Sequence, residues 1–271
     1  MLRDMTLGQY YQTDSVIHRM DPRVKLIGTI VYIVSLFLYK NVTAYVLAFV
    51  FLLAVIKISR VPFRFMVKGL KAVVFLLLIT SVFNLFLTRG EPLFVLWKFT
   101  ITREGLLNAV YIVIRLSFLI IGSSLMTLTT TPNQLTDGLE RLMKPLKVFK
   151  VPVHEVAMMM SIALRFIPIL MEETDKIMKA QMARGANFES GKLMEKVKAM
   201  VPLLVPLMIS AFRRANDLAM AMEARCYRGG EGRTKMKPLK YHSIDYGAFG
   251  VFCVYLVSVI VLGKVFPVNF L

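Results

Sequence analysis

The sequence is poor in the residues that build catalytic and metal sites. It has two cysteines, Cys226 and Cys253, and three histidines scattered along the chain. Two cysteines placed in this way offer neither a disulfide framework nor the spacing of a metal site. The sequence contains no Walker loop, nucleophile elbow, paired-carboxylate pattern or glycine-rich dinucleotide loop. We therefore expect a protein that is not an enzyme and that holds no metal or cofactor of its own.

Acidic residues are also scarce, since 17 Asp and Glu stand against 34 Lys and Arg, for a formal net charge of +17. A basic surface is one way to bind nucleic acid, but no recognisable nucleic-acid module is present. Retention of Lys and Arg on the cytoplasmic side of a membrane, together with attraction to anionic headgroups, explains the charge. We expect membrane lipid as a partner and no nucleic acid.

Apolar residues are abundant, at 56% of the 271 residues, and the mean hydropathy is +0.62. Both values exceed what a soluble globular domain normally shows. The apolar residues fall into blocks near the roughly 20 residues that a membrane-spanning helix needs. Five spans are predicted: Val24–Tyr39, Val42–Ile56, Ala72–Leu87, Gly105 to about Leu128, and Ile244–Leu262. The sequence therefore predicts an all-α, polytopic membrane protein with about five transmembrane helices.

Basic residues orient these spans, because Lys and Arg are retained in cytoplasmic loops. The loop predicted between the second and third spans holds five basic residues and no acidic one: Lys57, Arg60, Arg64, Lys68 and Lys71. We expect this loop and the N-terminus on the cytoplasmic side of a prokaryotic plasma (inner) membrane. Three regions follow: a four-span region over 1–128, a cytoplasmic coupling domain over 129–243, and a C-terminal transmembrane helix over 244–271.

Three coupling helices are predicted in the cytoplasmic region. Their expected bounds are Asn133–Lys147, about Val153–Arg184, and about Lys192–Arg225. The first is amphipathic, with leucines at three-to-four spacing. Gly185 is placed to stop the second. Pro202 and Pro206 should bend or break the third, which Gly229 and Gly230 should end.

The second and third coupling helices finish with similar triplets, Ala183-Arg184-Gly185 and Ala224-Arg225-Cys226. An arginine at a helix C-terminus can cap exposed carbonyls and answer the helix dipole. A guanidinium beyond a helix end is also a planar, permanently charged fork that suits the carboxylates of a partner protein. Spacing alone leaves capping and docking open.

Arg115 lies near the middle of the fourth predicted span, where an unpaired charge is costly. No acidic residue lies clearly inside another span. Backbone carbonyls, the Asn84 amide or a partner protein are the candidate counterparts. A structural intramembrane role is favoured over a place in a transport path, because the spans have few other polar residues.

Methionines are frequent in the coupling region: Met158, Met159, Met160, Met171, Met178, Met182, Met200, Met208, Met220 and Met222. Two interpretations of them are open. One is ordinary packing between helices. The other is an adaptable apolar surface that accepts different partners.

Four stretches resemble the transmembrane (T) component of energy-coupling factor transporters, and the resemblance runs over most of the chain. They are Ser15 with His18-Arg19-Met20-Asp21-Pro22-Arg23 and Lys25-Leu26; Thr131-Pro132, Leu135, Gly138-Leu139-Glu140 and Pro145-Leu146; Leu164-Arg165-Phe166-Ile167-Pro168; and Arg214-Ala215, Asp217 and Glu223-Ala224-Arg225. Their order and spacing together are specific to that family.

The resemblance implies a scaffold that holds two cytoplasmic ATPases and a separate membrane-embedded substrate-binding (S) component for uptake of vitamins or transition-metal ions. ATP and Mg would be bound by the ATPases. In that family, two arginine-centred motifs enter grooves on the ATPases, and these motifs fall here on Ala183-Arg184-Gly185 and Ala224-Arg225-Cys226. Cys226 stands where the family usually has glycine, which leaves open whether that position needs a left-handed backbone.

Two other functions remain as alternatives. A self-contained secondary transporter normally shows inverted repeats or broken, glycine-rich spans, and the sequence shows neither. The membrane-spanning permease subunit of a conventional ATP-binding cassette importer would carry one coupling helix per subunit, and two arginine motifs on one chain argue against it.

Overall fold

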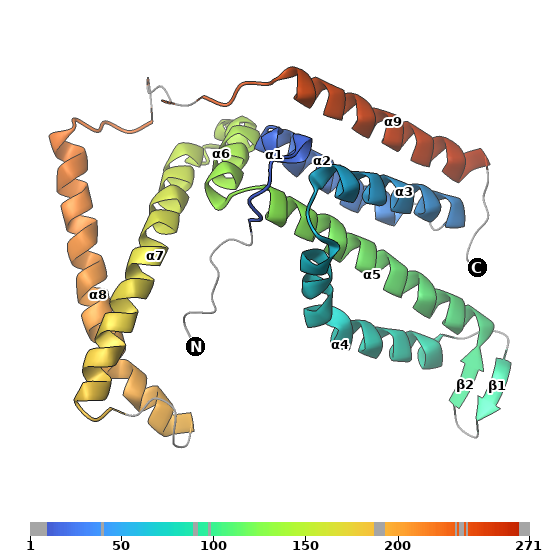
Figure 1. Ribbon diagram of the computed structural model, residues 1–271, viewed down its shortest axis with the longest axis horizontal. Coiled ribbons are helices and arrows are strands. Elements are labelled where there is room, and N and C mark those ends of the chain that lie inside the picture. The colour runs from blue at the N-terminus through green and yellow to red at the C-terminus, as the bar shows by residue number, and fades with distance from the viewer. Residues whose placement is uncertain are drawn as a thin grey trace. The chain divides into compact units, whose positions relative to one another are not determined.

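The structure is a computed structural model that describes residues 10–38, 41–88, 92–96, 99–186, 193–230, 232, 236 and 238–265. Within these residues the chain is almost entirely helical (Figure 1). The elements are α1 (Val16–Arg19), α2 (Pro22–Leu38), α3 (Val42–Ser59), α4 (Phe63–Leu87), β1 (Pro92–Leu96), β2 (Phe99–Thr102), α5 (Arg103–Thr129), α6 (Pro132–Met143), the 3₁₀ helix η2 (Lys144–Phe149), α7 (Val153–Ala183), α8 (Leu193–Ala224) and α9 (Ser243–Val265).

Several of these helices are long and apolar enough to cross a membrane. Among the described residues these are α3, α5, α7 and α9, and the two halves of α4, which meet at an angle of 58°, make a fifth. The α2 helix has 17 residues, which is near the lower limit for a span. The predicted all-α, polytopic membrane class is thus confirmed. Length and composition do not decide whether α7 lies in the cytoplasm, so that placement stays a prediction.

The connection between α3 and α4 is shorter than predicted. We expected the basic residues from Lys57 to Lys71 in a loop, but only residues 60–62 separate the two helices. Pro62 stands at the N-cap of α4, and the apolar residues that follow it support a helix rather than a loop. The loop prediction was therefore wrong for Lys57, which lies on α3, and for Arg64, Lys68 and Lys71, which lie on α4. Tyr39, the predicted end of the first span, lies outside the described residues.

The coupling helices differ from their predicted bounds where proline intervenes. The first was expected to reach Lys147, but α6 ends at Met143 and continues as η2, because Pro145 has no N–H to donate. Pro202 and Pro206 lie inside the unbroken α8, whose ribbon changes direction within its N-terminal half (Figure 1). Lys192, the predicted start of this helix, lies outside the described residues.

The residues of the short connection before α5 form a small hairpin that we had not predicted. β1 pairs with β2 in antiparallel fashion, with Phe94 opposite Ile101 and Leu96 opposite Phe99. α5 follows at once, and the Thr102 side chain caps it by accepting a hydrogen bond from the Gly105 N–H at 3.1 Å.

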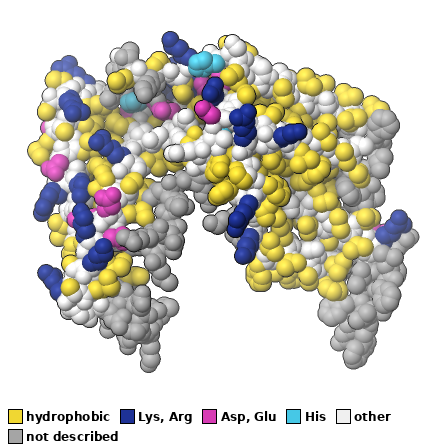
Figure 2. All heavy atoms as spheres, viewed as in Figure 1, with side chains coloured by type: hydrophobic (Ala, Val, Ile, Leu, Met, Phe, Trp, Pro, Cys, Tyr) yellow, Lys and Arg dark blue, Asp and Glu magenta, His cyan; other side chains and the backbone are white. Residues whose placement is uncertain are grey.

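The chain divides into two compact units, one containing Leu139–Pro238 and the other Gly8–Gly138 together with Leu239–Leu271. The first unit holds the antiparallel pair α7 and α8, and the second holds α2 to α5 and α9 (Figure 1). On the face shown in Figure 2, apolar side chains cover α2, α3 and α5, whereas Lys and Arg side chains are frequent on α7 and α8. These units follow from contacts within the chain. They do not test the predicted regions 1–128, 129–243 and 244–271, which describe membrane crossing.

The core of the larger unit is built from α2, α3, α5 and α9. Its buried residues include four tyrosines, and the set is Tyr32, Leu36, Ala44, Tyr45, Ala48, Leu52, Tyr111, Tyr255 and Val259. Lipid tails are as apolar as these side chains, so close packing and hydrogen bonds between helices, rather than burial alone, hold such helices together. Two glycines allow that packing: Gly28 lies against the Phe252 ring and Gly122 against the Tyr32 ring.

Gly28→Ala should loosen the contact between α2 and α9. A Cβ at Gly28 would lie 2.1 Å from Cζ of Phe252, so the ring must move. Overpacking of this kind costs about 1–3 kcal/mol, of which a better helix propensity returns at most about 1. We expect the thermal midpoint of the purified chain to fall. Gly250→Ala on α9 is the matched control, because a Cβ there meets open space, and an equal fall in both variants would contradict the packing explanation.

Asp245 ties the start of α9 to the start of α2. Its side chain is fully buried, at 0% exposed. Oδ1 accepts a hydrogen bond from the Asp21 N–H at 2.8 Å, and Oδ2 accepts one from the His242 N–H at 2.8 Å. The second bond is one half of a capping box at the N-terminus of α9. One buried carboxylate therefore satisfies backbone donors more than 220 residues apart.

Candidate functional site

The C-terminus of α7 has the backbone geometry of a Schellman motif. The Ala186 N–H donates to the Gln181 carbonyl at 3.0 Å, and the Gly185 N–H donates to the Met182 carbonyl at 3.0 Å. Gly185 has φ of +89°, the left-handed conformation that this motif requires. The prediction that Gly185 ends this helix is confirmed, and Arg184 is the C-cap residue.

The C-terminus of α8 has the same geometry. The Tyr227 N–H donates to the Met222 carbonyl at 3.0 Å, and the Cys226 N–H donates to the Glu223 carbonyl at 2.8 Å. Cys226 has φ of +54°, so it occupies the left-handed position that Gly185 holds on α7. We had expected Gly229 and Gly230 to end this helix, and that was wrong. The backbone turns three residues earlier, with a cysteine in place of glycine.

The two central arginines occupy the same position in this motif and point to solvent. Arg184 and Arg225 both follow the last helical residue directly, and both are exposed. Backbone N–H groups already satisfy the carbonyls of the last turn. Within the described part of the chain, neither guanidinium makes a hydrogen bond or an ion pair. In the described part of the chain the two guanidinium groups therefore do not cap these helix ends, and docking stays a prediction.

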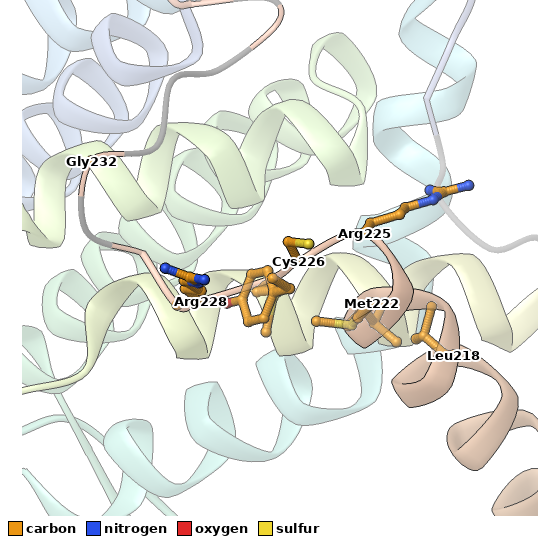
Figure 3. Close-up of a pocket in the computed structure, with 10 residues that line it drawn as sticks. Leu218, Met222, Arg225, Cys226, Arg228 and Gly232 are labelled. Atoms are coloured by element: carbon orange, nitrogen blue, oxygen red, sulfur yellow. The ribbon is translucent and has the colours of Figure 1, made fainter.

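The end of α8 borders a hollow on the surface of the smaller unit. Its apolar wall includes Met158, Ile162, Leu218 and Met222. Arg225 also lines this hollow, and in Figure 3 its side chain extends away from Met222 and Leu218. This guanidinium is thus free to meet a group outside the chain.

The two motifs lie at opposite ends of one helix pair. α7 and α8 run in opposite directions, so that their C-termini point apart (Figure 1). A helix of 31 residues is about 45 Å long at 1.5 Å per residue. The two arginines therefore lie at well-separated places on the helix pair.

Cys226→Gly should tighten the end of α8. A non-glycine residue in the left-handed region carries a steric cost of roughly 1 kcal/mol that glycine avoids. We expect amide hydrogen exchange at Cys226 and Tyr227 to slow about threefold in the variant, which corresponds to roughly 0.6 kcal/mol after the greater flexibility of glycine in the unfolded chain is allowed for.

Gly185→Cys is the mirror experiment, because it gives α7 the residue that α8 carries. Exchange at the end of α7 should accelerate by a similar factor. Faster exchange in Cys226→Gly than in the unchanged protein would mean that the thiol itself holds the turn.

Residues 15–26, the N-terminal stretch that carries part of the family resemblance, fold compactly against the end of α5. We call them the N-terminal plug. Ser15 caps α1 by accepting a hydrogen bond from the His18 N–H at 3.3 Å. The buried Lys25 ammonium donates to the His18 carbonyl at 3.2 Å and to the Thr129 carbonyl at 2.8 Å. Since Thr129 is the last residue of α5, Lys25 holds the N-terminal stretch to the point where the chain leaves that helix.

Asp21 is the second charged group of this plug. Arg23 donates to its carboxylate from Nε at 2.9 Å and from an η nitrogen at 2.7 Å. Burial alone would raise the pKa of Asp21, but these hydrogen bonds outweigh it and hold that pKa below its usual value. Arg23 also lies over the Tyr241 ring at 3.9 Å. The stretch is therefore a structural junction of α2 with the segment before α9.

The other stretches that carry the family resemblance also pack closely. Gly138 on α6 lies against Pro22 and Leu26, where an added Cβ would approach within 3.2 and 3.3 Å of their side chains. In the smaller unit, His154 Nδ1 lies 3.1 Å from Glu140 Oε1. Between α7 and α8, an Arg214 η nitrogen lies 3.2 Å from Glu173 Oε2.

Arg115 has partners that the sequence did not reveal. Its Nε donates to the Tyr45 hydroxyl at 2.9 Å, and an η nitrogen donates to the Tyr111 hydroxyl. Its guanidinium also lies 4.9 Å from the centre of the Phe37 ring. The Asn84 amide, one of the candidate counterparts, instead donates to the Thr80 carbonyl within α4. Tyrosines in apolar spans more often serve ordinary packing, so nothing in the sequence indicated this cluster.

The described residues contain no group of three or more His, Cys, Asp or Glu side chains that could hold a metal ion. The helix-end triplets and Arg115 are thus the sites left to explain.

The chain is similar to known transport proteins over most of its length. A family model described as cobalt transport protein matches residues 13–236. An energy-coupling factor transporter transmembrane protein of Clostridium kluyveri is 55% identical over 271 residues, which cover 97% of this chain and 100% of that protein. Proteins of the same name from Thermosediminibacter oceani and Bacillus subtilis are 53% and 50% identical, over 92% and 90% of this chain and 94% and 93% of their own lengths.

Proposed function

Because the chain belongs to the family of energy-coupling factor transporter transmembrane proteins, we propose that it is the scaffold on which two cytoplasmic ATPases and a substrate-binding S component assemble. The chain is a transmembrane transport component and is not itself catalytic. ATP and Mg would be bound by the partner ATPases. On this proposal the N-terminus and the region over 129–243 face the cytoplasm.

The observation that carries the proposal is the pair of equivalent helix ends. Ala183-Arg184-Gly185 and Ala224-Arg225-Cys226 share one hydrogen-bond pattern, one left-handed third residue and one exposed arginine. An arginine fork on a rigid helix end is preorganised for a carboxylate-lined groove, so little conformational freedom is lost on docking. Two such ends that point apart suit two ATPases, one at each.

The same helices give a route for mechanical coupling. When ATP binding draws the two ATPases together, each docked arginine is displaced with its ATPase. A helix end that is closed by a Schellman motif has no free turn to absorb the displacement, so the motion passes into the length of α7 and α8. These helices would then reorient the S component in the membrane.

Exposed methionines support a binding surface for the S component on α7 and α8. Those that are exposed in the described residues are Met159, Met160, Met182, Met194, Met200, Met208 and Met220. Methionine is unbranched and polarisable, so such a surface adapts to partners of different shape. The alternative, packing inside the chain, fits the other methionines of this region better than it fits these.

The transported substrate would be a vitamin or a transition-metal ion. The matched family model carries the description cobalt transport protein, whereas the relatives named above carry no substrate in their names. On this proposal the S component binds the substrate, and the residues of the present chain do not select it.

Copurification tests the proposal. The chain, tagged and extracted in mild detergent from its own cells, should bring down two ATPase subunits and one small membrane protein per copy, measured by native mass spectrometry. A homodimer with ATPases would identify a conventional importer permease. A chain that purifies alone yet transports substrate in vesicles would identify a self-contained transporter. Either result would overturn the scaffold.

A further inference from the structure

Arg115 lies level with one end of the α2–α3 hairpin, although it is in the middle of α5. Its ring partner Phe37 is the penultimate residue of α2, and its hydroxyl partner Tyr45 is the fourth residue of α3. The same end is bounded by α9, where the Asn41 side chain donates to the Gly263 carbonyl at 2.8 Å. From its place in the sequence alone, Arg115 would be put deeper in the membrane than its partners indicate. The guanidinium lies where α2 and α9 end and α3 begins, and we infer that this level is close to a membrane interface.

No carboxylate in the described part of the chain compensates this charge. Arg115 has no ion pair among the described residues, and α2, α3 and α4 contain no acidic residue. The nearest acidic residue on its own helix, Glu104, lies 11 residues earlier, which is about 16 Å along the axis. Asp245 is already occupied by two backbone donors. An uncompensated charge next to lipid is costly, so an anion from outside the chain is expected.

The tyrosines hold the guanidinium in one orientation and leave part of it free. A guanidinium has five N–H donors, and Arg115 uses two of them on the hydroxyls of Tyr45 and Tyr111. Tyr45 in turn donates to the Leu36 carbonyl at 2.7 Å, which fixes its position. The remaining donors form a planar fork that is suited to the two oxygens of a phosphate.

The wall beside this fork faces lipid rather than the core. Phe37, under the guanidinium, is 55% exposed, and Phe49 is 45% exposed and stacks on Phe118 at 5.8 Å. Exposed phenylalanine rings suit contact with acyl chains, whereas tyrosines such as Tyr45 and Tyr111 are typical of the headgroup level of a bilayer. The occupant that fits both the fork and the wall has a phosphate next to an acyl chain.

We propose that Arg115, Tyr45 and Tyr111 form a binding site for the phosphate of a membrane phospholipid, with its acyl chain along Phe37 and Phe49. The bound lipid supplies the missing negative charge and covers the exposed rings of Phe37 and Phe49. This inference is independent of the proposed scaffold function, because it concerns the chain alone in its membrane.

Binding of phosphatidylglycerol to the full-length chain tests this proposal. The chain is purified in detergent, depleted of lipid and titrated with phosphatidylglycerol, and occupancy is counted by native mass spectrometry. Arg115→Gln should weaken the tightest site about tenfold or more, as loss of a charge-assisted pair implies. Lys264→Gln is the matched control, because Lys264 is an exposed cation next to Gly263 at the same end of the hairpin and has no such cradle. Equal binding by Arg115→Gln and the unchanged chain would overturn the proposal.

Two further measurements show whether the bound anion belongs to a phospholipid or is free phosphate. Phosphatidylglycerol should raise the thermal midpoint of the unchanged chain, whereas diacylglycerol and inorganic phosphate should not. An equal rise with inorganic phosphate, or a phosphatidylglycerol effect that is unchanged in Arg115→Gln, would overturn a lipid site here. If Arg115→Gln does not fold, Tyr111→Phe decides: a threefold or larger loss of affinity supports the site, and unchanged affinity overturns it. Absence of any saturable binding of phosphatidylglycerol in the titration would leave a carboxylate of a partner protein as the counter-ion and would also overturn the lipid assignment.

Discussion

The double variant Arg184→Ala, Arg225→Ala is expected to lose both ATPases on copurification and to reduce uptake to background. Truncation of a docked arginine at the centre of an interface typically costs 2 kcal/mol or more, which is about a thirtyfold loss of affinity. The two arginines lie at opposite ends of α7 and α8, so their effects should be independent and multiply to about a thousandfold. Each single variant should retain one contact and an intermediate affinity.

The double variant needs a control for the general loss of positive charge. Lys176→Ala with Arg213→Ala removes two exposed cations from the same two helices, about two turns or more before their ends. This pair should leave copurification and uptake unchanged. Normal recovery of ATPases by the Arg184, Arg225 double variant, measured as subunits per chain, would show that the two arginines do not dock the ATPases.

Asp245→Ala is expected to cause the largest loss of stability of any single substitution considered for this chain. The carboxylate is fully buried and accepts from the backbone N–H groups of Asp21 and His242, both at 2.8 Å. Its removal leaves the buried Asp21 N–H without an acceptor, at about 1–3 kcal/mol, and also deprives the part-buried His242 N–H of its acceptor, at a smaller cost. We expect the free energy of unfolding, from denaturant titration of the purified chain, to fall by roughly 2–5 kcal/mol.

Two companion variants locate the cause of that loss. Asp245→Asn keeps one acceptor oxygen but turns an amide NH₂ toward the other donor, so it should lose about half as much. Asp14→Ala removes a carboxylate that is 84% exposed and 3.4 Å from Arg19, and it should leave stability unchanged. Equal effects of Asp245→Ala and Asp14→Ala would mean that the net charge matters and the buried hydrogen bonds do not.

The fold could be predicted from the sequence where local signals were strong. Apolar blocks of helical length predicted the membrane class, and Gly185 predicted the end of α7, because glycine is the residue that a left-handed C-terminal position favours. The same rule failed on α8. Gly229 and Gly230 were the obvious stops, yet Cys226 takes the left-handed position, because tertiary context can impose a conformation that a residue disfavours.

The candidate site could be predicted only in part, for a similar reason. Arg184 and Arg225 were found because they repeat in a recognisable triplet, which is a local pattern. The tyrosines around Arg115 come from α3 and α5, with residue separations of 70 and 4, and nothing near them in the sequence marks them as polar partners. Asp245 is different, because an acidic residue at the start of an apolar span is unusual and needs a partner, so the sequence itself points to a buried contact there.

Cys226 in place of glycine makes the two ends of the helix pair chemically different while their backbones match. Only the α8 end carries a thiol, and in the part of the chain that the structure describes this thiol is exposed and free. The other free thiol, at Cys253, lies along the apolar helix α9. A charged thiol reagent that stays in water should therefore modify Cys226 at the α8 end, whereas the α7 end has no thiol to modify. The rate of that reaction would report whether a partner covers the Arg225 end, with no substitution in the protein.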